Sequence, residues 1–225
     1  MGIADWRAFM RRELAAVLGV AVPLLAYVCL AAFVTDGGTR PFDEAIARAM
    51  HSPGHDDPIG PPWLESRIFE VTSLGSIMVV SLATLSATGL LLVLRKYGAA
   101  LLLLIAVGGG AGLSESSKIG LAHSISPLAD ESGMSFPSGH ATLAAVCYFT
   151  IAALLAREQE NRQVRTYILV IAVIATLLVG VSRVYLGVHR ATDVLGGWCL
   201  GAAWAIFCWN VAYWLERRGY AAQNA

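Results

Sequence analysis

Six long apolar runs constrain the fold of this chain more than any other feature of its sequence. A bilayer core about 30 Å thick requires roughly 20 mostly apolar residues per helix. Only 14% of the residues are charged and 56% are hydrophobic, whereas a typical soluble domain is about 25% charged. The sequence therefore predicts an all-α integral membrane bundle of six transmembrane helices. The expected spans cover residues 14–34, 71–94, 99–113, 140–156, 167–186 and 194–215.

The apolar runs fill the chain with no linker between them, so we expect a single membrane-embedded domain over residues 1–225. The third and fourth runs are short and end at polar residues, which predicts that their helices continue into a protein-lined cavity. The four cysteines form no CxxC pair, a pattern that indicates neither a zinc site nor a disulfide framework. The formal net charge of +0 gives no reason to expect a nucleic-acid partner.

Positive residues in the short connections predict the orientation of the chain in the membrane. If the N-terminus is inside, ten of the 16 Lys and Arg residues fall on the inner side. The outer side receives six, and three of those belong to the polar motifs described below. Both termini are therefore expected in the cytoplasm of a multi-pass inner-membrane protein. The first run is too long for the apolar part of a signal peptide and is expected to stay uncleaved.

The longest connection, residues 35–70, is expected to be an extracytoplasmic loop with short interfacial helices. Its first part has a helical face that would lie on the outer membrane surface. The residues that share this face are Phe42, Ile46, Ala49 and Met50. A second interfacial piece is expected at 61–64, with Trp63 at the depth of the lipid headgroups.

A cluster of polar residues lies where the fifth apolar run meets the sixth. Ser182-Arg183 is followed by His189 and Asp193, and ionisable side chains beside lipid are costly and usually serve a site. His189 and Asp193 are four residues apart and would lie one above the other in a helix, which would orient the imidazole. A helix cap with an exposed salt bridge is the alternative, and this segment alone does not decide between them.

Two further polar clusters are expected on the same outer side of the membrane. Lys118 follows the third run, and Pro137-Ser138-Gly139-His140 precedes the fourth. A helix that begins near Ser138 presents free backbone N–H groups, which Ser138 could cap and which attract phosphate. Lys118 and Arg183 would complete an anion-binding site. Each cluster also has a structural interpretation, such as a snorkelling lysine, but those interpretations do not explain why all three meet.

These motifs resemble those of the type-2 phosphatidic acid phosphatases. Pro137-Ser138-Gly139-His140 matches the PSGH motif of that family, and Ser182-Arg183 with His189 and Asp193 matches its SRxxxxxHxxxD motif. The family contains lipid phosphate phosphatases that share a catalytic core with the vanadium haloperoxidases. The order of the motifs and the six-span layout are also similar, so the resemblance covers most of residues 71–215.

The resemblance implies a covalent mechanism without a metal or other cofactor. His189 would attack phosphorus and form a phosphohistidine, while Asp193 holds its tautomer. His140 would protonate the leaving group and then activate water. The residues implied to hold the phosphate oxygens are Lys118, Ser138, Gly139 and Arg183.

The sequence departs from the family at its first motif, KxxxxxxRP. Lys118 is present, but Ile125 and Ser126 occupy the positions of the Arg and the Pro, and Pro127 comes one residue late. Losing one such donor can cost on the order of 100-fold in rate. We hypothesise that His123 supplies part of the missing positive charge. A loop histidine unrelated to phosphate explains His123 equally well.

The sequence thus predicts a membrane lipid phosphatase that acts on a lipid phosphate or diphosphate at the outer face of the cytoplasmic membrane. Undecaprenyl diphosphate, phosphatidylglycerophosphate, phosphatidic acid and lipid A phosphates all fit this chemistry. Two alternatives remain: a phosphotransferase that passes the phosphate to another lipid, and a catalytically silent relative that binds lipids. A vanadium haloperoxidase is disfavoured because those relatives are soluble.

Overall fold

The computed structural model describes residues 3–52, 58–122 and 136–223, and in these ranges the chain folds into helices joined by short connections. The elements are α1 (Ile3–Thr35), α2 (Arg40–Met50), α3 (Pro62–Thr72), η1 (Ser73–Gly75), α4 (Ile77–Val93), α5 (Tyr97–Ala122), α6 (Gly139–Arg157), α7 (Arg162–Tyr185) and α8 (Ala191–Gln223). Five of the described helices are long and apolar enough to cross a membrane, and there are six spans if the bent pair of 62–75 with 77–93 is counted as one. The predicted all-α membrane bundle is confirmed.

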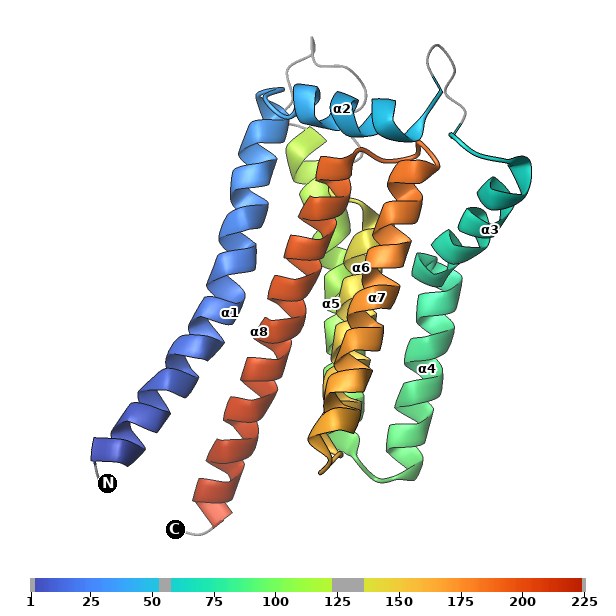
Figure 1. Ribbon diagram of the computed structural model, residues 1–225. Helices are drawn as coiled ribbons and strands as arrows, with labels where there is room; N and C mark the ends of the chain where they lie inside the picture. The colour runs from blue at the N-terminus through green and yellow to red at the C-terminus, as the bar shows by residue number, and fades with distance from the viewer. Residues whose placement is uncertain (1–2, 53–57, 123–135, 224–225) are drawn as a thin grey trace.

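The long helices run side by side, and both chain termini lie at the same end of the bundle (Figure 1). Helix α2 lies across the opposite end. Helix α6 is central, since it packs against α4, α5, α7 and α8, whereas α1 packs along α8. The core between α4, α5, α6 and α8 contains small and branched residues, including Leu103, Ala106, Val146 and Cys208.

The second predicted span is bent, which the apolar pattern did not indicate. Its two parts meet at an angle of 47°, where Ser76 caps α4 by accepting a hydrogen bond from the backbone N–H of Val79 at 3.3 Å. Gly75 at the bend is buried, and a Cβ there would lie 2.4 Å from Val179 Cγ1 and 3.1 Å from the carbonyl oxygen of His140. The bend therefore lets this span approach both α6 and α7.

Helix α5 is longer than the predicted third span and continues to Ala122, so that Lys118 lies within it. This confirms that the helix runs on through the polar residues. The last helix also begins earlier than predicted, at Ala191, so Asp193 lies in its first turn.

Part of the predicted apolar face of α2 packs on the bundle. Ile46 and Met50 lie against a cluster of Ala141, Val184 and Val194. Phe42 is 48% exposed, and its neighbour Asp43 is buried. The side of α2 that meets the bundle therefore also carries a carboxylate, which the sequence analysis overlooked.

Close contact between α6 and α8 fixes the polar end of the bundle. A Cβ on Gly197 would lie 2.8 Å from the carbonyl oxygen of Ser138 and 2.9 Å from Ala141 Cβ. Glycine permits this approach of two helix backbones, as in other membrane bundles. The start of α6 is thereby placed against the first turns of α8.

Candidate functional site

The turn between α7 and α8 determines where the His189 side chain lies. The carbonyl oxygen of Arg183 accepts hydrogen bonds from the backbone N–H groups of Val188, at 3.2 Å, and His189, at 3.3 Å. Gly187 makes the reversal possible with a φ of +67°, a left-handed conformation that glycine adopts without steric cost. The end of α7 therefore holds the backbone of His189 directly.

His189 and Asp193 form a close pair. His189 Nδ1 lies 3.3 Å from Asp193 Oδ2, and the side chains are 13% and 1% exposed. The same carboxylate oxygen accepts a hydrogen bond from the backbone N–H of Arg190 at 3.1 Å. Asp193 therefore both caps α8, where the helix dipole favours a negative charge, and orients the imidazole. The helix cap of the alternative interpretation is therefore present, but the pair is buried and is not an exposed salt bridge. With the proton on Nδ1, the Nε2 lone pair of His189 is available as a nucleophile.

The PSGH segment is held against the start of α8 by its backbone. The N–H of Ser138 donates to the carbonyl oxygen of Asp193 at 3.0 Å. The carbonyl oxygen of Ser138 accepts from the backbone N–H of Thr142, at 3.0 Å, and from its hydroxyl, at 2.9 Å. The bond from Ser138 to Asp193 brings the start of α6 next to the pair of His189 and Asp193, as the sequence predicted.

Ser138 occupies the N-cap position of α6, but its side chain makes no capping hydrogen bond. The sequence had suggested that the hydroxyl could cap the helix, and the structure does not show this. Its Oγ is fully buried and has no hydrogen-bond partner among the described residues. Buried hydroxyls usually have a partner, so this group is available to a ligand at the helix N-terminus.

The basic residues of the three motifs meet at His140. The side chains of Arg183, His189 and Lys118 all lie near its ring. Lys118 Nζ would be 3.4 Å from a Cβ placed on Gly139, which puts the ammonium group beside the start of α6. The Nε of Arg183 is buried and has no hydrogen-bond partner in the described part of the chain.

Glu115 is a member of this cluster that the sequence analysis missed. Its Oε1 accepts a hydrogen bond from Lys118 Nζ at 2.8 Å, and the two side chains are 67% and 28% exposed. The spacing of three residues in a helix could have revealed the pair. An exposed pair of this kind contributes little energy, so Lys118 can exchange the carboxylate for a phosphate oxygen.

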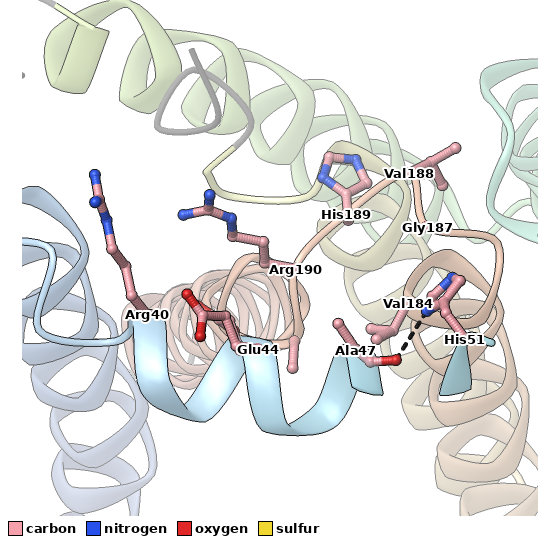
Figure 2. Close-up of a pocket in the computed structure, with 11 residues that line it drawn as sticks. Arg40, Glu44, Ala47, His51, Val184, Gly187, Val188, His189 and Arg190 are labelled. Atoms are coloured by element: carbon pink, nitrogen blue, oxygen red, sulfur yellow. Dashed lines mark hydrogen bonds between the residues drawn. The ribbon is translucent and has the colours of Figure 1, made fainter. Parts of the chain in front are cut away.

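A cavity of about 410 Å³ lies between α2 and the turn that carries His189. His189 and Arg190 line it on one side, and residues of α2 such as Arg40 and Glu44 line it on the other (Figure 2). The candidate nucleophile therefore borders open space.

Asp43 on α2 is a second residue that the sequence analysis missed. It is only 6% exposed. Its Oδ1 accepts a hydrogen bond from the backbone N–H of Thr192 at 2.9 Å, and its Oδ2 accepts from the Thr192 hydroxyl at 2.7 Å. The available signal was a carboxylate on the same helical face as Ile46 and Met50.

His123 and Ile125 lie outside the described residues.

The fold and the site together define a class of protein. An apolar helical bundle that gathers two histidines, an arginine, a lysine and a helix N-terminus at one end has the groups required of a membrane-embedded phosphatase. The chain belongs to the PAP2 superfamily, whose pattern matches residues 14–217. The resemblance seen in the motifs is thus confirmed.

Relatives with assigned names support the same class. A phosphatidylglycerophosphatase B of Bacillus subtilis is 35% identical over 182 residues, which cover 79% of this chain and 86% of the relative. An undecaprenyl-diphosphatase of Sulfolobus acidocaldarius is 37% identical over 73 residues, 32% of this chain and 31% of the relative. The crystal structure of a transmembrane PAP2-type phosphatidylglycerolphosphate phosphatase from Bacillus subtilis superimposes with a TM-score of 0.73 at 31% identity, covering 86% of this chain and 96% of that one. The present chain is a membrane lipid phosphatase of the PAP2 type.

Proposed function

We propose that this phosphatase releases inorganic phosphate from a lipid phosphate or diphosphate through a phosphohistidine at His189. The observation that carries the proposal is the buried contact between His189 Nδ1 and Asp193 Oδ2 at 3.3 Å. It leaves Nε2 of His189 as the nucleophile, next to a helix N-terminus where an anion binds well. Asp193 stabilises the positive charge that develops on the ring.

Two displacements complete the reaction. In the first, Nε2 of His189 forms a bond to phosphorus, and the bond from phosphorus to the leaving oxygen breaks. Protonated His140 gives its proton to that oxygen, which leaves as a lipid alcohol or a lipid phosphate. In the second, His140 takes a proton from water, the water oxygen attacks phosphorus, and the bond to His189 breaks. Inorganic phosphate leaves, and both histidines return to their starting states.

The transferred group needs donors for its nonbridging oxygens, because phosphoryl transfer depends mainly on positioning and electrostatic stabilisation. Ser138 Oγ and Arg183 Nε suit this role, since neither has a hydrogen-bond partner among the described residues. The backbone N–H of Gly139 and the ammonium group of Lys118 lie beside them. His123 remains a proposed additional donor on sequence grounds alone. No metal is required by this mechanism.

The proposed setting is one domain in the inner membrane, with the site on the periplasmic or exterior side. The excess of Lys and Arg on the inner side supports this orientation. Both termini lie at the end of the bundle opposite α2 (Figure 1), so cytoplasmic termini place α2 and His189 outside. The names of the relatives suggest phosphatidylglycerophosphate and undecaprenyl diphosphate as substrates.

A phosphate-release assay tests the proposal. The purified full chain in detergent micelles is offered phosphatidylglycerophosphate, undecaprenyl diphosphate, phosphatidic acid and a lipid A phosphate. His189→Ala is expected to lower the rate at least about 10³-fold, because only binding and electrostatic stabilisation remain without the nucleophile. His55→Ala, a histidine outside both motifs, serves as the matched control and is expected to keep the wild-type rate.

Two outcomes would contradict the proposal. If wild type and His189→Ala release equal phosphate from every lipid, the chain is not acting through this nucleophile. If radiolabelled phosphate appears on an acceptor lipid and not as free phosphate, the reaction is phosphotransfer.

A further inference from the structure

The first turn of α8 carries Asp193, and two other segments of the chain hold this turn in place. On one side, the backbone N–H of Ser138 donates to the Asp193 carbonyl oxygen at 3.0 Å. On the other side, the Asp43 carboxylate accepts both hydrogen bonds that Thr192 offers, at 2.9 and 2.7 Å. Asp43 is 149 residues away in sequence, so this contact depends on the tertiary fold.

The contact of Asp43 with Thr192 is shielded from water. Asp43 is 6% exposed and Thr192 is 2% exposed. Hydrogen bonds to a charged acceptor are about twice as strong as neutral ones, and a buried N–H that loses its acceptor is costly. The carboxylate also faces the N-terminus of α8, where the helix dipole favours a negative charge.

Helix α2 provides a firm support for this carboxylate. Ile46 and Met50, three and seven residues after Asp43, pack against Ala141, Val184 and Val194. Those three residues belong to the helices that carry His140, Arg183 and Asp193. The apolar contacts therefore fix α2 on the bundle, and Asp43 then fixes the first turn of α8 relative to it.

We infer that Asp43 is a positioning residue, which holds Thr192 and thereby the Asp193 carboxylate in the place where it orients His189. This inference rests on the proposed role of His189 and Asp193. Asp43 acts through Thr192, whose two donors occupy both of its carboxylate oxygens. Its loss should therefore slow the chemical step more than it weakens substrate binding.

The test uses the purified full chain and separates kcat from KM. Asp43→Asn keeps the shape of the side chain, but its NH₂ group accepts no hydrogen bond, so the two donors of Thr192 no longer each have an acceptor oxygen. We expect kcat to fall about 10- to 100-fold, as small displacements of catalytic groups do, with KM within about threefold of wild type. Thr192→Val removes only the hydroxyl and should give a smaller fall in kcat, whereas Thr192→Ser keeps both donors and should retain the wild-type rate.

The matched control is Asp36→Asn. This carboxylate lies in the turn after α1 and is exposed, and the substitution removes the same charge by the same chemical change. It is expected to leave kcat unchanged. The thermal unfolding midpoint of every variant is also measured. All rates are compared at a temperature well below these midpoints, where every variant is folded.

The possible outcomes distinguish the positioning role of Asp43 from the proposed function itself. If His189→Ala abolishes phosphate release while Asp43→Asn and Thr192→Val match wild type, Asp43 has no positioning role and the proposed function stands. If Asp36→Asn slows kcat as much as Asp43→Asn, the effect is one of general charge and the inference is wrong. The inference is also overturned if Thr192→Ser is as slow as Thr192→Val. If His189→Ala keeps the wild-type rate, the proposed function fails and the inference fails with it.

Discussion

The contact of Asp193 with His189 predicts a large loss of rate when the carboxylate is replaced by an amide. Asp193→Asn is nearly isosteric, and its oxygen can still accept from His189 Nδ1 and from the N–H of Arg190. What disappears is a negative charge 3.3 Å from a ring nitrogen. At an effective dielectric constant of about 20, that charge stabilises a developing imidazolium by about 5 kcal/mol. Since about 1.4 kcal/mol changes a rate tenfold, kcat should fall about 10³- to 10⁴-fold.

The same substitution should change the free energy of unfolding by only about 1 kcal/mol, since the cap to Arg190 survives and only the favourable charge at the N-terminus of α8 is lost. The assay is kcat for phosphate release at saturating lipid phosphate, together with thermal unfolding in the same detergent. Asp36→Asn, a change of an exposed carboxylate in the turn after α1, is the control and should match wild type. A kcat for Asp193→Asn within about threefold of wild type would refute the reasoning.

Three further changes follow from contacts in the structure. Gly197→Ala should destabilise the protein by about 1–3 kcal/mol, because its Cβ would lie 2.8 Å from the carbonyl oxygen of Ser138. Gly112→Ala is the control: a Cβ there has nothing within 4 Å, so the unfolding midpoint should be equal or slightly higher. Glu115→Gln should lower KM for the lipid phosphate about twofold by freeing Lys118 from its 2.8 Å ion pair, and an unchanged KM would argue against Lys118 as a phosphate ligand. The hydrogen bond from Lys96 lowers the pKa of Glu158, so the ionised carboxylate stabilises the fold at a pH above the ordinary pKa of a glutamate. Wild type should therefore unfold at a slightly higher temperature than Glu158→Gln at neutral pH, and this difference should vanish as the pH falls through the lowered pKa. A difference that grows in acid would contradict the assignment.

Several parts of the site could be predicted because they are local in sequence or follow from topology. The spacing of His189 and Asp193 places them on one helical turn, although Asp193 lies inside α8 and His189 lies in the turn before it. The predicted spans bring Lys118, His140 and Arg183 to one end of the bundle, since a chain that crosses the membrane repeatedly alternates sides. Glu115 is also local and could have been paired with Lys118 by its spacing.

Other features could not be read from local pattern. The bend at Ser76 interrupts a run that is apolar on both sides, and its reason is the approach of Gly75 to Val179 and the backbone of His140. The hydroxyl of Ser138 is buried and has no hydrogen-bond partner within the described ranges, which contradicts the side-chain cap that its sequence position suggests. In both places, packing against another helix outweighs the local preference.

The sequence by itself determined that the chain crosses a membrane and which residues are candidates for phosphate chemistry, because both follow from hydropathy and from the spacing of motifs. The tertiary structure alone decided how those residues are held. The link from Asp43 to Thr192 joins segments 149 residues apart, and such a contact depends on where α2 folds over the ends of α7 and α8. No periodicity encodes that meeting, since it results from the packing of Ile46 and Met50 on the assembled bundle.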